Sequence, residues 1–154
     1  MSTKPSVKTA REVFDIWKQE DRELERQLDL IRQWMMETSA ASNENRFEES
    51  ASRLSQLRSY LKQHFDHENE LTYQLSEIYP KPSPEIEAIQ RQAARDHVQL
   101  LEKIDALIED MNRLAPPFDS WQAAIDQVEW FVDLLEQHEE QESESICAMM
   151  PSTG

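Results

Sequence analysis

The sequence predicts an all-α protein folded as an up-down-up-down four-helix bundle. Four segments carry apolar residues at alternating steps of three and four, which is the spacing of a helix that buries one face. The alternation that marks a half-buried strand, rich in Val, Ile and Thr, is absent from the sequence. Polar or proline-rich breaks separate the segments, so we expect helices of roughly 25 to 35 residues that pack antiparallel to their neighbours.

The first expected helix carries an acidic residue on its apolar face. Asp21 occupies the position between Trp17 and Leu24 where the period requires an apolar side chain. The polar stretch TSAASNEN, residues 38–45, interrupts the period with residue types that cap helices. The apolar members of this face are Phe14, Trp17, Leu24, Leu28, Ile31 and Met35.

A leucine stripe defines the second expected helix, and a histidine and a glutamate interrupt it. His64 and Glu68 stand four residues apart at two positions where the stripe requires leucine. His67 lies roughly 80° from the centre of the stripe, so we expect it at the surface. The prolines of the segment YPKPSP prevent this helix from continuing. The stripe consists of Leu54, Leu57, Leu61, His64, Glu68, Leu71 and Leu75.

The third and fourth expected helices also place histidine on an apolar face. The third has Pro84 in its first turn and stops at the segment APPFDS. Asp119 or Ser120 can cap the fourth helix, which Pro151 ends. The third stripe consists of Ile86, Ile89, Ala93, His97, Leu100, Ile104, Leu107 and Met111. The fourth consists of Trp121, Ile125, Val128, Val132, Leu135, His138, Glu142, Ile146 and Met149.

Length and composition restrict the classes of function. We expect one domain over residues 1–154, in which residues 1–10 and 151–154 are flexible tails. A net charge of −15 argues against nucleic acid or an anionic membrane as a partner. The lone glycine, Gly154, excludes glycine-rich phosphate-binding loops. A single cysteine, Cys147, and the lack of an apolar targeting or membrane segment indicate a cytoplasmic protein, whose oligomeric state the sequence leaves open.

Six polar side chains interrupt the four apolar faces. Each would cost about 1 to 3 kcal/mol if it were buried without a partner, and more if it were charged. A shared site explains all six, because the middle parts of antiparallel helices meet at similar heights. Histidine and carboxylate ligands suit iron, manganese or zinc, and each HxxxE pair places both ligands on one helix face. The predicted metal ligands are Asp21, His64, Glu68, His97, His138 and Glu142.

Simpler explanations apply to single residues but not to the repeated pattern. A lone buried histidine such as His97 is more often hydrogen bonded within a core than bound to a metal. The HxxxE pair, however, occurs on the second helix and again on the fourth. We expect the other residues of the acidic run EQHEEQESES, residues 136–145, to form a solvated face whose charge could also gather cations.

The order of these residues resembles the hemerythrin-like, or HHE cation-binding, family. That family carries a histidine on the first helix, HxxxE on the second, a histidine on the third and HxxxE on the fourth. The segments HFDHENEL, RDHVQLLEKI and LLEQHEEQE follow this order over nearly the whole chain. The resemblance implies a non-haem, carboxylate-bridged centre of two iron ions inside the bundle. It also implies that Glu68 and Glu142 are bridges and that His64, His97 and His138 are terminal ligands.

The sequence departs from the family pattern at two positions. Leu101 stands where oxygen-carrying hemerythrins have a second histidine on the third helix, so the resemblance is closer to the four-histidine domain of iron–sulfur cluster repair and nitric-oxide-response proteins. Asp21, within KQEDRELERQL, replaces the first-helix histidine. A carboxylate there adds a negative charge, which should favour ferric iron and lower the reduction potential. A ferritin-like site is not expected, because its Glu-x-x-His spacing does not occur.

The expected function is binding or reaction of a small ligand at a di-iron centre. Oxygen, peroxide and nitric oxide are the candidate ligands, and the candidate roles are a sensor, a scavenger or an iron–sulfur repair-type factor. One alternative is a helical module that binds metal without turnover, for iron storage or transfer or with structural zinc or manganese. Another is an acidic interaction bundle that has lost its site. The sequence identifies no catalytic residue and leaves open whether the protein is an enzyme.

Overall fold

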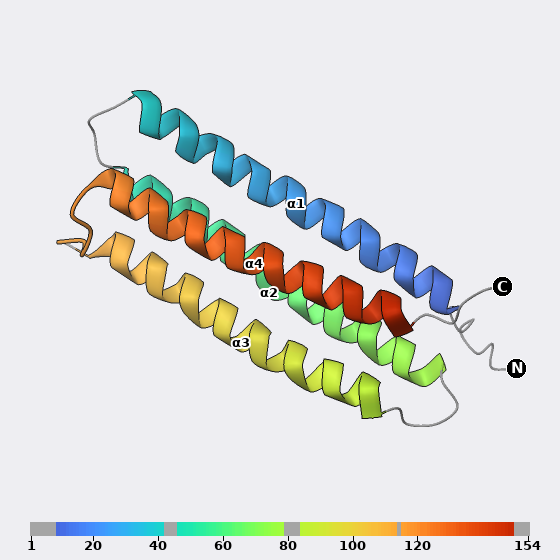
Figure 1. The fold of residues 1–154 in the computed structure, drawn as a ribbon. Helices are drawn as coiled ribbons and strands as arrows, with labels where there is room; N and C mark the ends of the chain where they lie inside the picture. Colours follow the sequence, from blue (N-terminus) through green and yellow to red (C-terminus); the bar gives the residue numbers. More distant parts are fainter. Residues whose placement is uncertain (1–8, 42–45, 79–83, 114, 150–154) are drawn as a thin grey trace, which may run out of the picture.

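Four long helices make up most of the structure (Figure 1). The computed structural model describes residues 9–41, 46–78, 84–113 and 115–149. The helices are α1 (Ala10–Ala41), α2 (Phe47–Ile78), α3 (Pro84–Asn112) and α4 (Trp121–Met149). No strand occurs within these described ranges, and none of their helices is long and apolar enough to cross a membrane. The all-α prediction is therefore confirmed.

The predicted tails fall mainly on residues that the structure does not describe. Residues 1–8 and 150–154 lie outside the described ranges, so the prediction of flexible tails remains a prediction. Residues 42–45 and 79–83, which contain most of the predicted breaks on either side of the second helix, also lie outside them.

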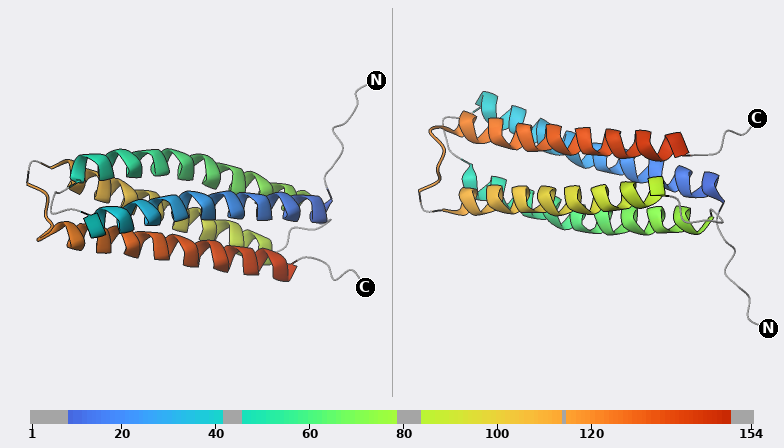
Figure 2. Two further views of the ribbon diagram at one scale, coloured as in Figure 1. Left: turned by 90° about the horizontal axis from the view of Figure 1, so that it is seen from above. Right: turned by 60° about the horizontal axis from the view of Figure 1, so that its bottom comes forward.

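The four helices run up, down, up and down, and α1 begins at the same end of the bundle at which α4 ends (Figures 1 and 2). α1 packs against α2 and α4, and α3 packs against the same two helices. α1 and α3 therefore stand diagonally across the bundle. This arrangement confirms the predicted topology and lets all four helices contribute side chains to one interior.

Side-chain caps account for the starts of two helices. Thr9 Oγ1 accepts a hydrogen bond of 3.1 Å from the backbone N–H of Glu12 at the start of α1. Ser120, one of the two predicted caps, accepts a bond of 3.1 Å from the N–H of Ala123 at the start of α4. Pro84 is the first residue of α3, where its missing N–H costs no helical hydrogen bond.

Helix α1 extends beyond the predicted break. It continues to Ala41, into the polar stretch 38–45. Thr38 is buried there, and its hydroxyl donates a hydrogen bond of 3.1 Å to the carbonyl of Met35. The polar group is thus satisfied inside the helix, so this residue type, which often ends helices, does not end this one.

The predicted stripes face the interior of the bundle. Asp21 and Ile89 are half-buried, and the other stripe residues whose side chains are described are buried. The buried apolar residues form two clusters, and the polar members of the stripes lie between them. On α1, for example, Trp17 belongs to the smaller cluster and Leu24 to the larger one. Asp21 is thus part of a polar layer across the bundle with apolar residues on both sides.

Candidate metal centre

The polar layer brings the six predicted ligands together from all four helices. Its members form two groups, in each of which ligand atoms lie within 4.8 Å of one another. The first ligand group consists of Glu68, His97, His138 and Glu142, and the second consists of Asp21, His64, Glu68 and Glu139. Glu68, on α2, belongs to both groups and therefore lies between them.

Imidazole nitrogens face carboxylates in the middle of the layer. His64 Nε2 lies 3.1 Å from Glu68 Oε1 and 3.2 Å from Glu139 Oε1. His97 Nε2 lies 3.7 Å from Glu68 Oε1 and 3.6 Å from Glu142 Oε1. Nitrogen and oxygen ligand atoms from three helices are therefore directed toward a common interior space.

Two further carboxylates face the outer nitrogens of the histidines. Asp96 Oδ2 lies 3.2 Å from Nδ1 of His138, whose Nε2 is 2.8 Å from Glu142. Glu20 Oε2 lies 3.4 Å from Nδ1 of His64. A carboxylate at Nδ1 favours a proton on that nitrogen, which leaves Nε2 to bind a metal. His138 thus has the hydrogen-bonded outer partner that metal-binding histidines commonly have, whereas Glu20 lies near Nδ1 of His64 without a hydrogen bond to it.

Several buried polar atoms of the layer have no hydrogen-bond partner, which is costly without a ligand. They are both oxygens of Glu68, Nε2 of His97 and of His138, and one oxygen each of Asp21, Glu139 and Glu142. The short distances from Glu68 and Glu142 to the histidine nitrogens therefore do not correspond to well-directed hydrogen bonds. An unsatisfied buried polar group costs about 1 to 3 kcal/mol. Cations would accept lone pairs from these atoms, and the mixture of imidazole and carboxylate fits iron, manganese or zinc.

Histidine protons supply the positive charge of the metal-free layer. Burial opposes the charge of His64, but Glu139 and Glu68 outweigh it and raise its pKa to about 11. Burial raises the pKa of Glu68 well above its usual value. Burial also acts to raise the pKa of Glu142, but His138 and His97 lower it to about 2. A cation that binds here must displace histidine protons.

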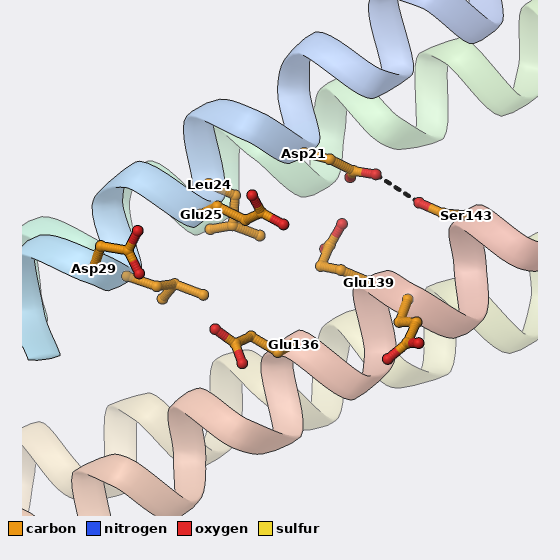
Figure 3. Close-up of a pocket in the computed structure, with 9 residues that line it drawn as sticks. Asp21, Leu24, Glu25, Asp29, Glu136, Glu139 and Ser143 are labelled. Atoms are coloured by element: carbon orange, nitrogen blue, oxygen red, sulfur yellow. Dashed lines mark hydrogen bonds between the residues drawn. The ribbon is translucent and has the colours of Figure 1, made fainter.

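A chain of hydrogen bonds fixes Asp21. Trp17 Nε1 donates to Ser143 Oγ over 3.1 Å, and the Ser143 hydroxyl donates to Asp21 Oδ2 over 2.5 Å (Figure 3). Burial raises the pKa of Asp21 to about 7, although the bond from Ser143 opposes this shift. The other oxygen, Oδ1, is buried and has no hydrogen-bond partner. Ser143 therefore holds one carboxylate oxygen and leaves the other available to a ligand.

The family becomes clear when the sequence is compared with known protein families. The hemerythrin HHE cation binding domain matches residues 12–150. The chain belongs to the hemerythrin family. No curated protein and no solved structure matches it. The match confirms the resemblance predicted from the HxxxE pairs and identifies this hemerythrin as a cation-binding domain with two candidate ligand groups.

The sequence prediction for this hemerythrin missed Glu139. Glu139 is only 8 % exposed. The prediction that the acidic run is solvated apart from His138 and Glu142 is therefore wrong at this residue. Glu139 borders a pocket between α1 and α4, and its Oε1 faces His64, so contacts between helices bury it. A signal was present, because Glu139 fits the alternating steps of three and four formed by Val128, Val132, Leu135, Glu139, Glu142 and Ile146.

Three other sequence predictions concern residues in or near the two ligand groups. Glu142 lies in the first ligand group, and its predicted role as a second bridge remains a prediction. His67 is exposed, as predicted, and its Nδ1 lies 2.7 Å from Glu20 Oε1. Leu101, at the position of the second third-helix histidine of oxygen carriers, is partly buried against the larger apolar cluster. Glu139, which lies outside the family pattern, is thus the one member of the two ligand groups that the sequence did not predict.

Aromatic rings cover the histidines of the polar layer. The ring of Phe65 stacks on His97 with centroids 4.0 Å apart and an interplanar angle of 6°. Phe65 also meets His138 edge-on, with centroids 6.1 Å apart. The Tyr60 ring stacks on His64 at 5.9 Å. These rings restrict rotation of the imidazoles and exclude water from the side of the larger apolar cluster.

In this hemerythrin, pockets reach the polar layer from two sides. The α1–α4 pocket, of about 440 Å³, touches the second ligand group; it is lined by Asp21, Leu24, Glu25, Leu28, Asp29, Glu136, Glu139, Glu140 and Ser143 (Figure 3). The α3–α4 pocket, of about 330 Å³, touches the first ligand group; it is lined by Ala88, Ile89, Gln92, Ala93, Asp96, His138, Gln141, Glu142 and Ser145. Each ligand group therefore has its own route to the surface.

Proposed function

We propose that this hemerythrin holds two iron ions in its polar layer and that a small ligand such as oxygen, peroxide or nitric oxide binds or reacts there. The observation that carries the proposal is the position of Glu68, which belongs to both ligand groups. Both of its oxygens are buried and have no hydrogen-bond partner, and a carboxylate offers lone pairs on each oxygen. Glu68 is thus suited to join two cations.

The two ligand groups would hold the two ions unequally. His97, His138 and Glu142 would bind the first ion together with Glu68. The remaining residues of the second group, Asp21, His64 and Glu139, would bind the second ion together with the same glutamate. When bound, iron supplies one-electron redox chemistry and coordination positions that the protein does not fill. The one additional carboxylate of the second group favours ferric iron there.

The surrounding residues control what reaches the layer. Phe65 and Tyr60 cover the histidines on the side of the larger apolar cluster. The α3–α4 pocket, which is lined by small, apolar and amide side chains beside Asp96 and Glu142, is suited to an uncharged diatomic molecule. Such access supports a role as a sensor, a scavenger or an iron–sulfur repair-type factor. The lone cysteine supports our prediction of a cytoplasmic protein.

Metal analysis combined with an absorption spectrum in air tests this function. We expect protein purified without added metal to contain two irons per chain and to absorb as carboxylate-bridged ferric iron does. Azide or nitric oxide should change the spectrum, because each binds at a coordination position that the protein leaves open. Zinc in place of iron, or a colourless protein with one metal or none, would contradict the proposal.

The carboxylate-rich second group favours one alternative, a module that holds manganese or zinc without turnover. Oxygen ligands suit manganese, and a His-carboxylate site also accepts zinc. The same experiment separates the two functions. A metal-loaded protein whose spectrum does not respond to azide, nitric oxide or peroxide would favour the module.

A further inference from the structure

The α1–α4 pocket carries more negative charge than the second ligand group requires. Asp21 and Glu139 belong to that group, but four other lining residues are also acidic: Glu25, Asp29, Glu136 and Glu140. None of the residues that line the pocket is basic. Arg32 lies close by and forms an ion pair with Glu136. Within the described ranges, Glu25, Asp29 and Glu140 have no ion pair, so their charges are not neutralised locally.

A buried carboxylate oxygen without a partner lies at the inner end of this pocket. Glu139 is 8 % exposed, and its Oε1 faces His64 Nε2 at 3.2 Å. Its Oε2 is buried and has no hydrogen-bond partner. In Figure 3 the Glu139 side chain reaches from α4 toward α1, into the space beside Glu25 and Asp21. A free oxygen of this kind, directed into an acidic pocket, indicates a cation as the ligand.

The α3–α4 pocket provides a comparison within the same molecule. It leads to the same polar layer, but most of its lining is uncharged, including Gln92, Gln141 and Ser145. Its two acidic residues, Asp96 and Glu142, both face His138, at 3.2 and 2.8 Å. Unpaired negative charge is therefore a property of the α1–α4 pocket and not of every opening to the layer.

We propose that the α1–α4 pocket captures a divalent cation such as Fe²⁺ and passes it to the second ligand group through Glu139. Glu25, Asp29 and Glu140 attract the hydrated ion, and Oε2 of Glu139, a buried oxygen without a hydrogen-bond partner in the lining of the pocket, receives it. The proposal rests on the proposed function, because the destination of the ion is the polar layer. Clefts lined by charge of one sign increase association rates by about 10- to 1000-fold, and salt reduces this effect.

Co²⁺ uptake, followed by its visible absorption after rapid mixing with metal-free protein, tests the proposal. The pocket variant is Glu25→Gln/Glu140→Gln, which removes two charges from the pocket and none of the candidate ligands. The control is Glu102→Gln/Glu129→Gln, which removes two charges from exposed positions on α3 and α4 away from the pocket. Wild type and both variants are compared at low and at high salt.

We expect the pocket variant to take up Co²⁺ roughly tenfold more slowly than wild type at low salt. Its final Co²⁺ content should equal that of wild type, the difference in rate should shrink at high salt, and the control should match wild type. Equal rates for the two variants, or a lower final content in the pocket variant, would overturn the capture proposal. A wild-type protein that binds no Co²⁺ would instead contradict the proposed metal centre, so the two failures are distinguishable.

Discussion

Glu139 Oε1 on α4 lies 3.2 Å from Nε2 of His64 on α2. This contact adds Glu139 to the second ligand group, which then has one histidine and three carboxylates, whereas the first group has two of each. The two ligand groups therefore differ in charge, although they share Glu68. An ion in the second position should be held by harder and more negative ligands than its neighbour.

Ser143 should matter for the second position although it is not a candidate ligand. In Ser143→Ala, Asp21 and Trp17 Nε1 lose the hydroxyl that connects them. We expect the free energy of unfolding of the metal-free protein to fall by about 1 to 3 kcal/mol. Affinity for the second metal ion should fall about 10- to 100-fold. Denaturant unfolding and a metal titration measure these changes.

Ser145→Ala is the matched control for this variant. Ser145 lies on the same helix but lines the α3–α4 pocket, away from Asp21. It should leave both the unfolding free energy and the second metal affinity close to the wild-type values. Similar losses in the two serine variants would show that the hydrogen bond to Asp21 has no special role.

Metal-free protein should lose stability as pH rises from about 4 to about 7 because of Asp21. Burial raises its pKa from 3.8 to about 7, so in this range the folded state binds the proton more strongly than the unfolded state does. The contribution of His64, whose raised pKa is about 11, is fully present below its ordinary pKa of 6.5. We expect Asp21→Asn to remove the loss, so its melting temperature should exceed that of wild type at pH 7.5 and match it near pH 4.

Asp29→Asn is the control for the pH experiment. Asp29 lines the same pocket but is exposed, and its carboxylate has no hydrogen bond or ion pair within the described part of the chain. The melting temperature of this variant should follow that of wild type across the pH range. A constant difference between Asp21→Asn and wild type from pH 4 to 7.5 would show that Asp21 does not titrate in this way.

Asp21→His should raise the reduction potential of the iron-loaded protein. The substitution restores the family histidine and removes one negative charge from the second ligand group, so ferric iron is stabilised less. The bundle should remain folded, because Asp21 is only half-buried at the edge of the layer. A redox titration measures the potential, and Asp29→His makes the same change of charge farther along the pocket. If both variants shift the potential equally, Asp21 is not a ligand.

The helices and their order could be predicted because the apolar period is a local property. His64 and Glu68 lie on the leucine stripe, and the structure buries both of them with the leucines. The same period placed His97 and His138 in the interior. Four stripes with short breaks are sufficient to predict an antiparallel bundle, and the HxxxE pairs were sufficient to suggest the family that the comparison shows.

The division of the ligands into two groups could not be predicted from the sequence. It depends on how α1 packs against α4, because this packing brings Asp21 and Ser143 together. His138 and Glu139 are adjacent in the chain, and a single stripe assigns only one of them to the interior. A helix in the corner of a bundle contacts two neighbours, so both residues are buried. Thr38 shows the same limit, because its hydroxyl bonds to the carbonyl of Met35 and α1 continues past it to Ala41.

The iron content of Glu68→Gln tests the central claim most directly. Glu68 belongs to both ligand groups, whereas Glu139 belongs only to the second. We expect two irons per chain in wild type, loss of the second ion in Glu139→Gln, and weakened binding of both ions in Glu68→Gln, with circular dichroism confirming that each variant is helical. A helical Glu68→Gln protein that retains two irons, or that loses one while binding the other as tightly as wild type, would contradict a centre bridged by Glu68.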